Sequence, residues 1–256
     1  MAVKLGVFGA GGRMGREIVN LIIRDPRAVL AGAVEAAGHP SVGAHLAGGV
    51  TVCSNPLALA HAAQVLIDFT TPDALAANLE AACSGRRAIL VGTTGLAPAH
   101  MKAIDSAARS IPILQSANTS LGVTLLAALV EAAARRLGAG WAAEILELHH
   151  GGKADAPSGT ALLLGAAVAA GRGEAAPSPK TSRTGARSDA DIGFASLRGG
   201  TSPGEHSVMF LGEGERLELT HRAESRAIFA HGAVTAALWL ADQSPGRYTM
   251  RDCLPV

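Results

Sequence analysis

A glycine-rich segment near the start of the chain places the strongest constraint on its fold. An apolar run at residues 4–8 leads directly into Gly9-Ala10-Gly11-Gly12-Arg13-Met14-Gly15, which opens a stretch with helical periodicity. Glycines let a loop backbone approach a pyrophosphate, and free N–H groups at a helix start stabilise its charge. The spacing is GxxGxxG rather than GxGxxG, but the strand, turn and helix are the context that a dinucleotide fingerprint requires. The segment therefore predicts a parallel α/β unit with a dinucleotide at its first turn.

The first 116 residues alternate short aliphatic runs with longer helical patterns, as in a parallel sheet covered by helices on both faces. Strands are expected near residues 4–8, 29–34, 50–53, 65–69, 88–91 and 111–114. Helices are expected at 14–23, 73–83 and 99–108. The fold class is therefore α/β, with an N-terminal Rossmann dinucleotide-binding domain.

The pattern changes after residue 118, where helix and strand no longer alternate strictly. A helix at 121–137 precedes a strand at 143–148, a glycine-rich loop and another helix. Residues 171–189 are rich in Gly, Ser, Pro and Arg and predict an exposed excursion. Strands follow near 193–197, 207–211 and 216–220, with an antiparallel arrangement and a hairpin at 212–215, and a buried helix at 228–241. This part predicts a second, α+β domain.

Composition excludes several classes of protein. The net charge is +1 without a basic run, so nucleic acid is not an expected partner. The most apolar stretch, 161–170, is shorter than the roughly 20 residues that cross a bilayer, and the N-terminus lacks the pattern of a signal peptide. Cys53, Cys83 and Cys253 suit reduced thiols. These features predict a cytoplasmic protein with no membrane partner.

Glu35 strengthens the prediction of a dinucleotide site. It ends the second expected strand, 20 residues beyond Gly15, where a carboxylate can accept both hydroxyls of the adenosine ribose. Alone, it would equally suit a solvated acid at a strand end. Ala36 follows, with no Lys or Arg nearby, so a 2′-phosphate would meet uncompensated negative charge. NADH is therefore expected over NADPH, with Arg13 as the residue that could reverse this preference.

Two further segments follow expected strands, at the sheet edge where ligands bind in open α/β folds. They are DFTTP at residues 68–72 and GTTG at 92–95. Either could line the nicotinamide. Thr, Pro and Gly are also common in turns, so both segments suit plain connections equally well.

The densest chemistry lies in residues 147–160, where a strand runs into a loop and a helix start. His149, His150 and Lys153 could attract a small anion, and each can donate a proton. Neighbouring residues of a strand point to opposite sides, so both histidines face one pocket only if the loop has already turned. A metal is less favoured, because further ligands at a suitable spacing are lacking. The predictions therefore include no metal.

Ser158-Gly159-Thr160 precedes an apolar helical run and predicts a helix N-cap. The exposed N–H groups of such a helix start bind carboxylates as well as phosphates. Without basic neighbours the same segment would suit a cap that holds no ligand.

Taken together, these motifs resemble those of the 4-hydroxy-tetrahydrodipicolinate reductase family, also called dihydrodipicolinate reductases. The resemblance covers essentially the whole chain, and the histidine–lysine block is its most specific part. It rests on GVFGAGGRMG at 6–15, DFTTP at 68–72, GTTG at 92–95, SANTSLGV at 116–123, HHGGKADAPSGTAL at 149–162, GFASLRGGTSPGEHSVMF at 193–210 and the segment 214–240. It implies reduction of 4-hydroxy-tetrahydrodipicolinate to tetrahydrodipicolinate with NAD(P)H, in diaminopimelate and lysine biosynthesis.

The resemblance also implies roles for individual residues. His149 corresponds to the proton donor/acceptor and Lys153 to a second proton donor, while His150, Gly159 and Thr160 correspond to substrate-binding positions. The positions that correspond to dinucleotide contacts are Gly9, Ala10, Gly11, Gly12, Arg13, Met14, Glu35, Gly92, Thr93, Thr94, Ser116, Ala117, Asn118 and Thr119.

The family's architecture implies two domains and an assembly. Residues 1–120 plus 230–256 would form the Rossmann domain, and residues 121–229 would form a substrate-binding domain whose sheet assembles a homotetramer. The small dicarboxylate substrate is then the expected small-molecule partner.

Some positions depart from the family pattern. Gly151 and Gly152 replace a bulkier basic pair, Ala36 replaces a frequent arginine, and Thr119 stands where an aromatic residue is common. Two other functions stay open from the residues alone. One is another Rossmann dehydrogenase of a small acidic substrate, and the other is a dinucleotide-sensing protein without turnover.

Overall fold

The chain divides into two compact units. The structure is a computed structural model that describes residues 1–175, 179–182, 184–188 and 191–254. The first unit comprises Met1–Ser120 and Ala227–Val256, and the second comprises Leu121–Arg226. The prediction from sequence had placed the return to the first unit at residue 230. Each unit has its own sheet and its own hydrophobic core.

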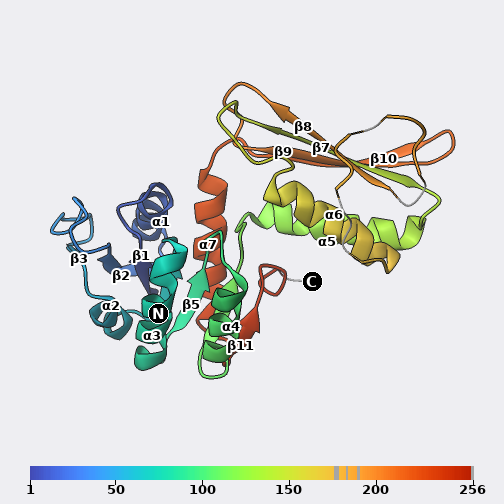
Figure 1. Cartoon of the computed structure of the whole chain (residues 1–256). Coiled ribbons are helices and arrows are strands. Elements are labelled where there is room, and N and C mark those ends of the chain that lie inside the picture. Colours follow the sequence, from blue (N-terminus) through green and yellow to red (C-terminus); the bar gives the residue numbers. More distant parts are fainter. Residues whose placement is uncertain (176–178, 183, 189–190, 255–256) are drawn as a thin grey trace. The chain divides into compact units, whose positions relative to one another are not determined.

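The first unit is built on a parallel sheet with the strand order β11-β6-β5-β4-β1-β2-β3 (Figure 1). Its central strands are fully buried aliphatic runs, as in sheets covered on both faces. All six expected strands are present, and β11 is an additional one that lacks an aliphatic run. The bounds are β1 Val3–Phe8, β2 Ala28–Val34, β3 Val52–Cys53, β4 Val65–Asp68, β5 Ala88–Val91, β6 Pro112–Gln115 and β11 Gly246–Tyr248.

Helices cover this sheet, and local sequence signals account for the buried face of α1 and the start of α2. Helix α1 buries Gly15, Ile18, Val19 and Ile22, which recur at helical spacing along one face. Helix α2 begins after Asn55, whose side chain accepts two backbone N–H bonds at the helix start. It was not among the expected helices. The bounds are α1 Arg13–Arg24, α2 Pro56–Ala62, η1 Pro72–Ala74, α3 Leu75–Gly85, α4 Pro98–Ala107 and α7 Ala227–Leu240.

Helix α7 brings the end of the chain back to the first unit. It contacts α1 and strands β4, β5 and β6. Small residues line most of its buried surface, including Ala230, Gly232, Ala233 and Ala237. The expected burial of the helix at 228–241 is therefore confirmed, because a helix apolar on most faces is stable only inside a core.

The second unit has a four-stranded sheet with the order β10-β9-β7-β8. Strand β9 pairs antiparallel with both β7 and β10, whereas β7 and β8 are parallel. The expected antiparallel arrangement is therefore right for the hairpin β9–β10 and wrong for β8. Helix α6 and the excursion after it supply the long crossover that a parallel pair needs. The bounds are β7 Ala142–His149, β8 Ile192–Arg198, β9 Glu205–Leu211 and β10 Arg216–Arg222.

Helices α5 (Leu121–Leu137) and α6 (Gly159–Arg172) pack together on one face of this sheet (Figure 1). The close approach of α6 to the sheet requires a glycine, because a β-carbon at Gly165 would lie 2.4 Å from Phe194 Cζ on β8. The expected excursion starts later than residue 171, since α6 continues to Arg172 and ends at Gly173 with φ +74°. Residues 176–178, 183 and 189 of it lie outside the described residues. No helix in the described part of the chain is long and apolar enough to cross a membrane.

Candidate active site

The glycine turn after β1 leaves an open helix start. Gly9 has φ +76°, and the N–H of Gly12 donates to its carbonyl at 3.0 Å. A β-carbon at Gly15 would lie 2.0 Å from the Gly9 oxygen, so only glycine fits there. Gly12 is the N-cap of α1, and no side chain among the described residues caps it. The first amides of α1 can therefore bind an anion such as a pyrophosphate.

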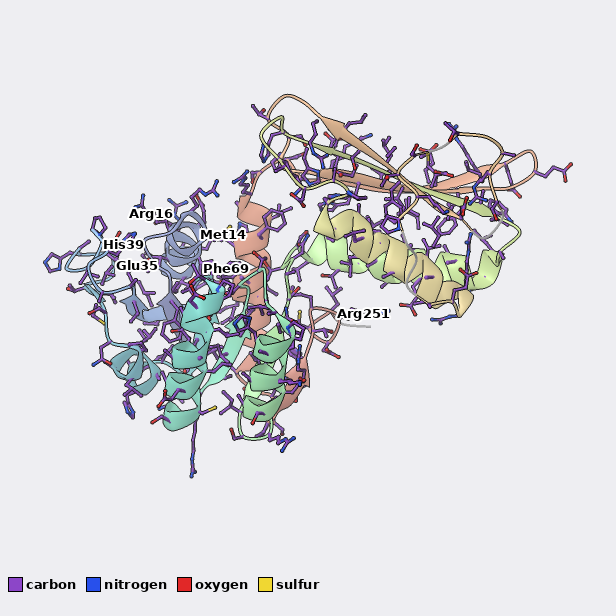
Figure 2. The ribbon with its side chains drawn as sticks, viewed as in Figure 1. Met14, Arg16, Glu35, His39, Phe69 and Arg251 are labelled. Carbon is purple, nitrogen blue, oxygen red and sulfur yellow. The ribbon has the colours of Figure 1, made fainter. Side chains whose placement is uncertain are left out.

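Glu35 stands directly beside this turn. Its Oε2 accepts from the Gly11 N–H at 2.8 Å, and its Oε1 accepts from the Ala36 N–H at 3.0 Å. Figure 2 shows Glu35 and His39 near the first turn of α1, which carries Met14 and Arg16. The two carboxylate oxygens are thus oriented at the end of β2, where a ribose would need acceptors.

A cleft of about 420 Å³ joins these elements. The predicted residues Gly9, Gly12 and Glu35 line it, whereas Ala10, Gly11, Arg13 and Met14 belong to the same turn without lining the cleft. None of the described residues that line it is Lys or Arg. Sequence reasoning did not select several of its other lining residues, which include Phe8, His39, Ser54, Pro56 and Asn78. They come from four separate segments, and single motifs could not reveal them.

Asp68 ties the carboxyl ends of β4 and β5 together. It is fully buried and accepts from Thr70 Oγ1 at 2.6 Å, Thr93 Oγ1 at 3.2 Å and Asn78 Nδ2 at 3.2 Å. Burial raises the pKa of Asp68, and these hydrogen bonds oppose the rise. The predicted residues Gly92, Thr93 and Thr94 follow β5 at this edge. A β-carbon at Gly92 would lie 2.4 Å from the Phe69 ring, so the edge is closely packed.

The predicted residues Ser116–Thr119 follow β6 along the same edge of the sheet. Ser116 Oγ donates to the Asn118 carbonyl at 2.6 Å, and Ala117 is exposed. Thr119 is buried, and its Oγ1 donates to the Phe229 carbonyl at 2.6 Å. The hydroxyl that replaces the family's aromatic residue is therefore engaged with helix α7.

In the second unit, His149 ends β7 with a buried side chain that is 7% exposed. Its Nδ1 forms a short hydrogen bond with Glu147 Oε2. His150 diverges from it: its N–H donates to the Ser202 carbonyl at 3.0 Å, and its ring lies 3.2 Å from Arg226 Nη2. The two histidines therefore have different neighbours, in agreement with the alternation of strand side chains.

Lys153 lies in the loop between β7 and α6. Its Nζ donates to both carboxylate oxygens of Asp155, at 2.7 and 2.9 Å. This bond lowers the pKa of Asp155. Arg198 holds the loop backbone, because it donates to the Lys153 carbonyl at 3.3 Å and to the Asp155 carbonyl at 2.6 Å. Asp155 thus holds the ammonium of Lys153, and Arg198 holds the loop backbone that carries both residues.

The start of α6 confirms the predicted cap. Ser158 Oγ accepts from the Ala161 N–H at 3.1 Å. Gly159 is exposed, and a β-carbon there would meet nothing within 4 Å. Thr160 is the next residue of the helix. The first N–H groups of a helix have no acceptor within the helix, so the amide of Gly159 can receive a carboxylate.

The buried ionisable groups of this site have shifted pKa values, which favour a charged carboxylate and neutral histidines. Burial alone would raise the pKa of Glu147, but hydrogen bonds from Arg198, Ser196, His149 and the Ser158 amide outweigh it and hold the pKa at about 2. Burial lowers the pKa of His149 against the opposing effect of Glu147. Burial and the neighbouring His149 lower the pKa of His206 to about 4. The site therefore combines a permanent anion with two histidines that favour the neutral form.

The ligand atoms of Glu147, His149 and His206 lie within 4.8 Å of one another, as metal ligands would. However, Arg198 donates to both oxygens of Glu147, at 2.9 Å each. A cation would have to displace this guanidinium, so the donor set favours an ion pair over a metal.

Together, a dinucleotide cradle in one unit and a buried acid–base cluster beside an open helix start in the other define a nucleotide-dependent oxidoreductase of a small anion. Models of the dihydrodipicolinate reductase N-terminus and C-terminus match residues 3–119 and 122–254. The chain belongs to the dihydrodipicolinate reductase family. Membership makes it an NAD(P)H-dependent reductase of diaminopimelate and lysine biosynthesis, and it confirms the family, fold class and reaction expected from the sequence.

Individual relatives agree over the whole length. The chain is 50% identical to a 4-hydroxy-tetrahydrodipicolinate reductase of Zymomonas mobilis, over 99% of this chain and 97% of the relative. It is 49% identical to that of Rhodopseudomonas palustris, over 98% and 97%. A solved structure of dipicolinate-bound dihydrodipicolinate reductase from Paenisporosarcina sp. TG-14 has the same fold, with TM-score 0.81, 24% identity and coverage of 99% and 100%.

Proposed function

We propose that His149 is the proton donor/acceptor and Lys153 a second proton donor in the reduction of 4-hydroxy-tetrahydrodipicolinate to tetrahydrodipicolinate. The observation that carries this proposal is the combination of a buried, oriented imidazole, a loop-held ammonium and the N-terminus of helix α6 within residues 149–160. NAD(P)H, when bound, supplies the hydride. The protein's own side chains must therefore bind the dicarboxylate and move protons as water is lost.

The substrate's two carboxylates need separate partners. The start of α6 at Gly159 and Thr160 suits one of them, because a helix N-terminus favours an anion. Lys153 and the partly buried ring of His150 supply charge and hydrogen bonds on the loop side. In the first unit, the glycine turn at Gly9–Met14, Glu35 and the edge at Gly92–Thr94 and Ser116–Thr119 would hold the dinucleotide.

We further propose that NADH is the preferred cofactor. Glu35 holds two carboxylate oxygens beside the glycine turn, and the cleft there has no Lys or Arg among its described lining residues. A 2′-phosphate would therefore be repelled there. Arg13 is exposed on the first turn of α1 and is the alternative partner for such a phosphate.

The face of the second unit's sheet opposite α5 and α6 supports assembly into a homotetramer, which we propose acts in the cytoplasm. Alternation along the strands places Leu146, Leu148, Met209 and Leu211 on the face away from α5 and α6. Met209→Glu should then dissociate the assembly, whereas Leu129→Glu on the exposed side of α5 should not. Light scattering after size-exclusion chromatography measures the outcome, and a monomeric wild type would refute this assembly.

The direct test is a reduced-nicotinamide absorbance assay with substrate generated from pyruvate and aspartate semialdehyde. Wild-type enzyme should oxidise NADH in a substrate-dependent manner, while His149→Gln and Lys153→Ala should lose most of that activity. Oxidation only with another acidic substrate would identify a different dehydrogenase. Cofactor binding without turnover of any such substrate would identify a sensing protein.

A further inference from the structure

Glu147 forms hydrogen bonds with several residues of the second unit's site, although it was assigned no role from the sequence. It is 1% exposed on the buried face of β7, two residues before His149. One oxygen bonds to His149 Nδ1, and the other accepts from the Ser158 N–H at 3.1 Å. Arg198 donates to both oxygens. A single carboxylate thus contacts the end of one strand, the end of its neighbour and the start of helix α6.

The contact with His149 determines which ring nitrogen carries the proton. An ionised carboxylate only accepts hydrogen bonds, so Nδ1 must donate to it. The neutral ring then has its lone pair on Nε2. That atom is the one that can accept or return a proton, since Nδ1 is engaged with Glu147 in both protonation states.

Through its contact with Ser158, Glu147 also positions the start of helix α6, which is proposed to bind a substrate carboxylate. Ser158 is the N-cap residue directly before Gly159 and Thr160. Because its N–H is bonded to the same carboxylate that holds His149, the first turn of α6 and the imidazole share one anchor. A change in the position of Glu147 would displace both.

We propose that Glu147 is a positioning residue that fixes the Nδ1-protonated tautomer of His149 and holds the start of helix α6 at a fixed position relative to the His149 ring. The proposal rests on the proposed role of His149 in proton transfer. Charge balance supports it, because Arg198 compensates Glu147 and allows the ring to exchange its proton. The other ionisable groups that face His149 are Lys153 on the loop and His206 on β9.

A purely structural ion pair between Glu147 and Arg198 would stabilise the fold without directing the imidazole. The variant Glu147→Gln keeps the shape and removes the charge, and the tautomer and pH profile of His149 then separate the two roles, because a purely structural ion pair would affect neither. Glu144→Gln is the matched control, because Glu144 lies on the opposite face of β7 in an ion pair with Arg187 at 3.3 Å.

The experiment combines kinetics with nitrogen NMR of the His149 ring in the full-length protein. Glu147→Gln is expected to lower kcat by about 100-fold, the scale of a misdirected acid–base group. It should also move the His149 limb of the pH–rate profile to lower pH and abolish the dominance of the Nδ1–H tautomer. Glu144→Gln should behave like wild type in all three measurements.

Two outcomes would overturn the proposal. One is a wild-type ring that carries its neutral proton on Nε2, a measurement that requires no variant to fold. The other is Glu147→Gln with unchanged tautomer and pH profile, whatever its thermal stability. His149→Gln in the same assay tests the underlying role separately: full activity there would refute the assignment of His149, while the tautomer measurement would still judge Glu147.

Discussion

Gly204 closes the site at the edge of the His149 ring. A β-carbon at Gly204 would stand only 2.7 Å from His149 Nε2, and the residue adopts φ +148°. A side chain at this position would therefore collide with the atom proposed to exchange the proton. The glycine lies between β8 and β9, so the loop that joins these strands limits the space beside the imidazole.

Gly204→Ala should accordingly displace the imidazole. We expect kcat to fall by about 100-fold, as displacements near 1 Å can cause, together with about 1–3 kcal/mol of lost stability from the strained backbone. Steady-state kinetics and urea unfolding measure the two effects. Gly199→Ala, where a β-carbon meets nothing within 4 Å, is the control. Wild-type turnover in Gly204→Ala would show that the ring tolerates a shift.

Lys153→Ala should lower turnover by about 10²- to 10⁴-fold while leaving NADH affinity nearly unchanged. The reason is that Lys153 lies in the second unit, whereas the predicted dinucleotide residues belong to the first. Lys102→Ala, on the exposed side of α4, provides a matched loss of charge. Cofactor titration and the absorbance assay together check the prediction, which near-normal turnover would refute.

Exchange of Ala36 for arginine should shift cofactor use toward NADPH. A guanidinium beside Glu35 would supply the phosphate partner that the cleft lacks, and such a charge-assisted bond corresponds to about a 10-fold change or more in kcat/KM. The ratio of kcat/KM for NADPH and NADH measures it at fixed ionic strength. Arg13→Ala is the companion variant: a large loss of NADPH activity there would show that Arg13 already binds the phosphate.

Acid should weaken the fold through His206. Its pKa of about 4 lies below the ordinary 6.5, so the unfolded chain binds a proton more readily than the folded one. Stability is therefore complete above pH 6.5 and falls as pH decreases toward 4, by about 3 kcal/mol from this group. Urea midpoints across this range should decline less steeply in His206→Gln. Equal slopes for both proteins would exclude His206 as the source.

Local patterns predicted most of the fold but not its long-range pairings. The aliphatic runs and the glycine turn identified six strands of the first sheet. Strand β11 was not predicted from the sequence, because Gly246, Arg247 and Tyr248 form a strand only by pairing with β6. The parallel partner of β8 was equally hidden, since the choice between two neighbours is made by tertiary packing.

The site shows the same division. His149, Lys153 and the Ser158 cap were visible in one short segment, whereas Arg198 reaches Glu147 across 51 positions of sequence. No spacing rule reports such a contact. One signal was available: Glu147 lies two residues before His149 on a strand, which places both side chains on one face. A buried acid beside a histidine on the same face could have been selected on that ground.

The hydrogen bond between Thr119 Oγ1 and the Phe229 carbonyl has a consequence for modularity. It joins the end of the first chain segment to helix α7, which returns the chain to the first unit. The chain therefore leaves the first unit and returns to it at neighbouring positions, with residues 121–226 between them. This is the architecture of one domain inserted into a loop of another, and a short linker could replace the inserted domain. The hydrogen bond thereby holds the two chain segments of the nucleotide-binding unit together at the point where another catalytic domain could be inserted.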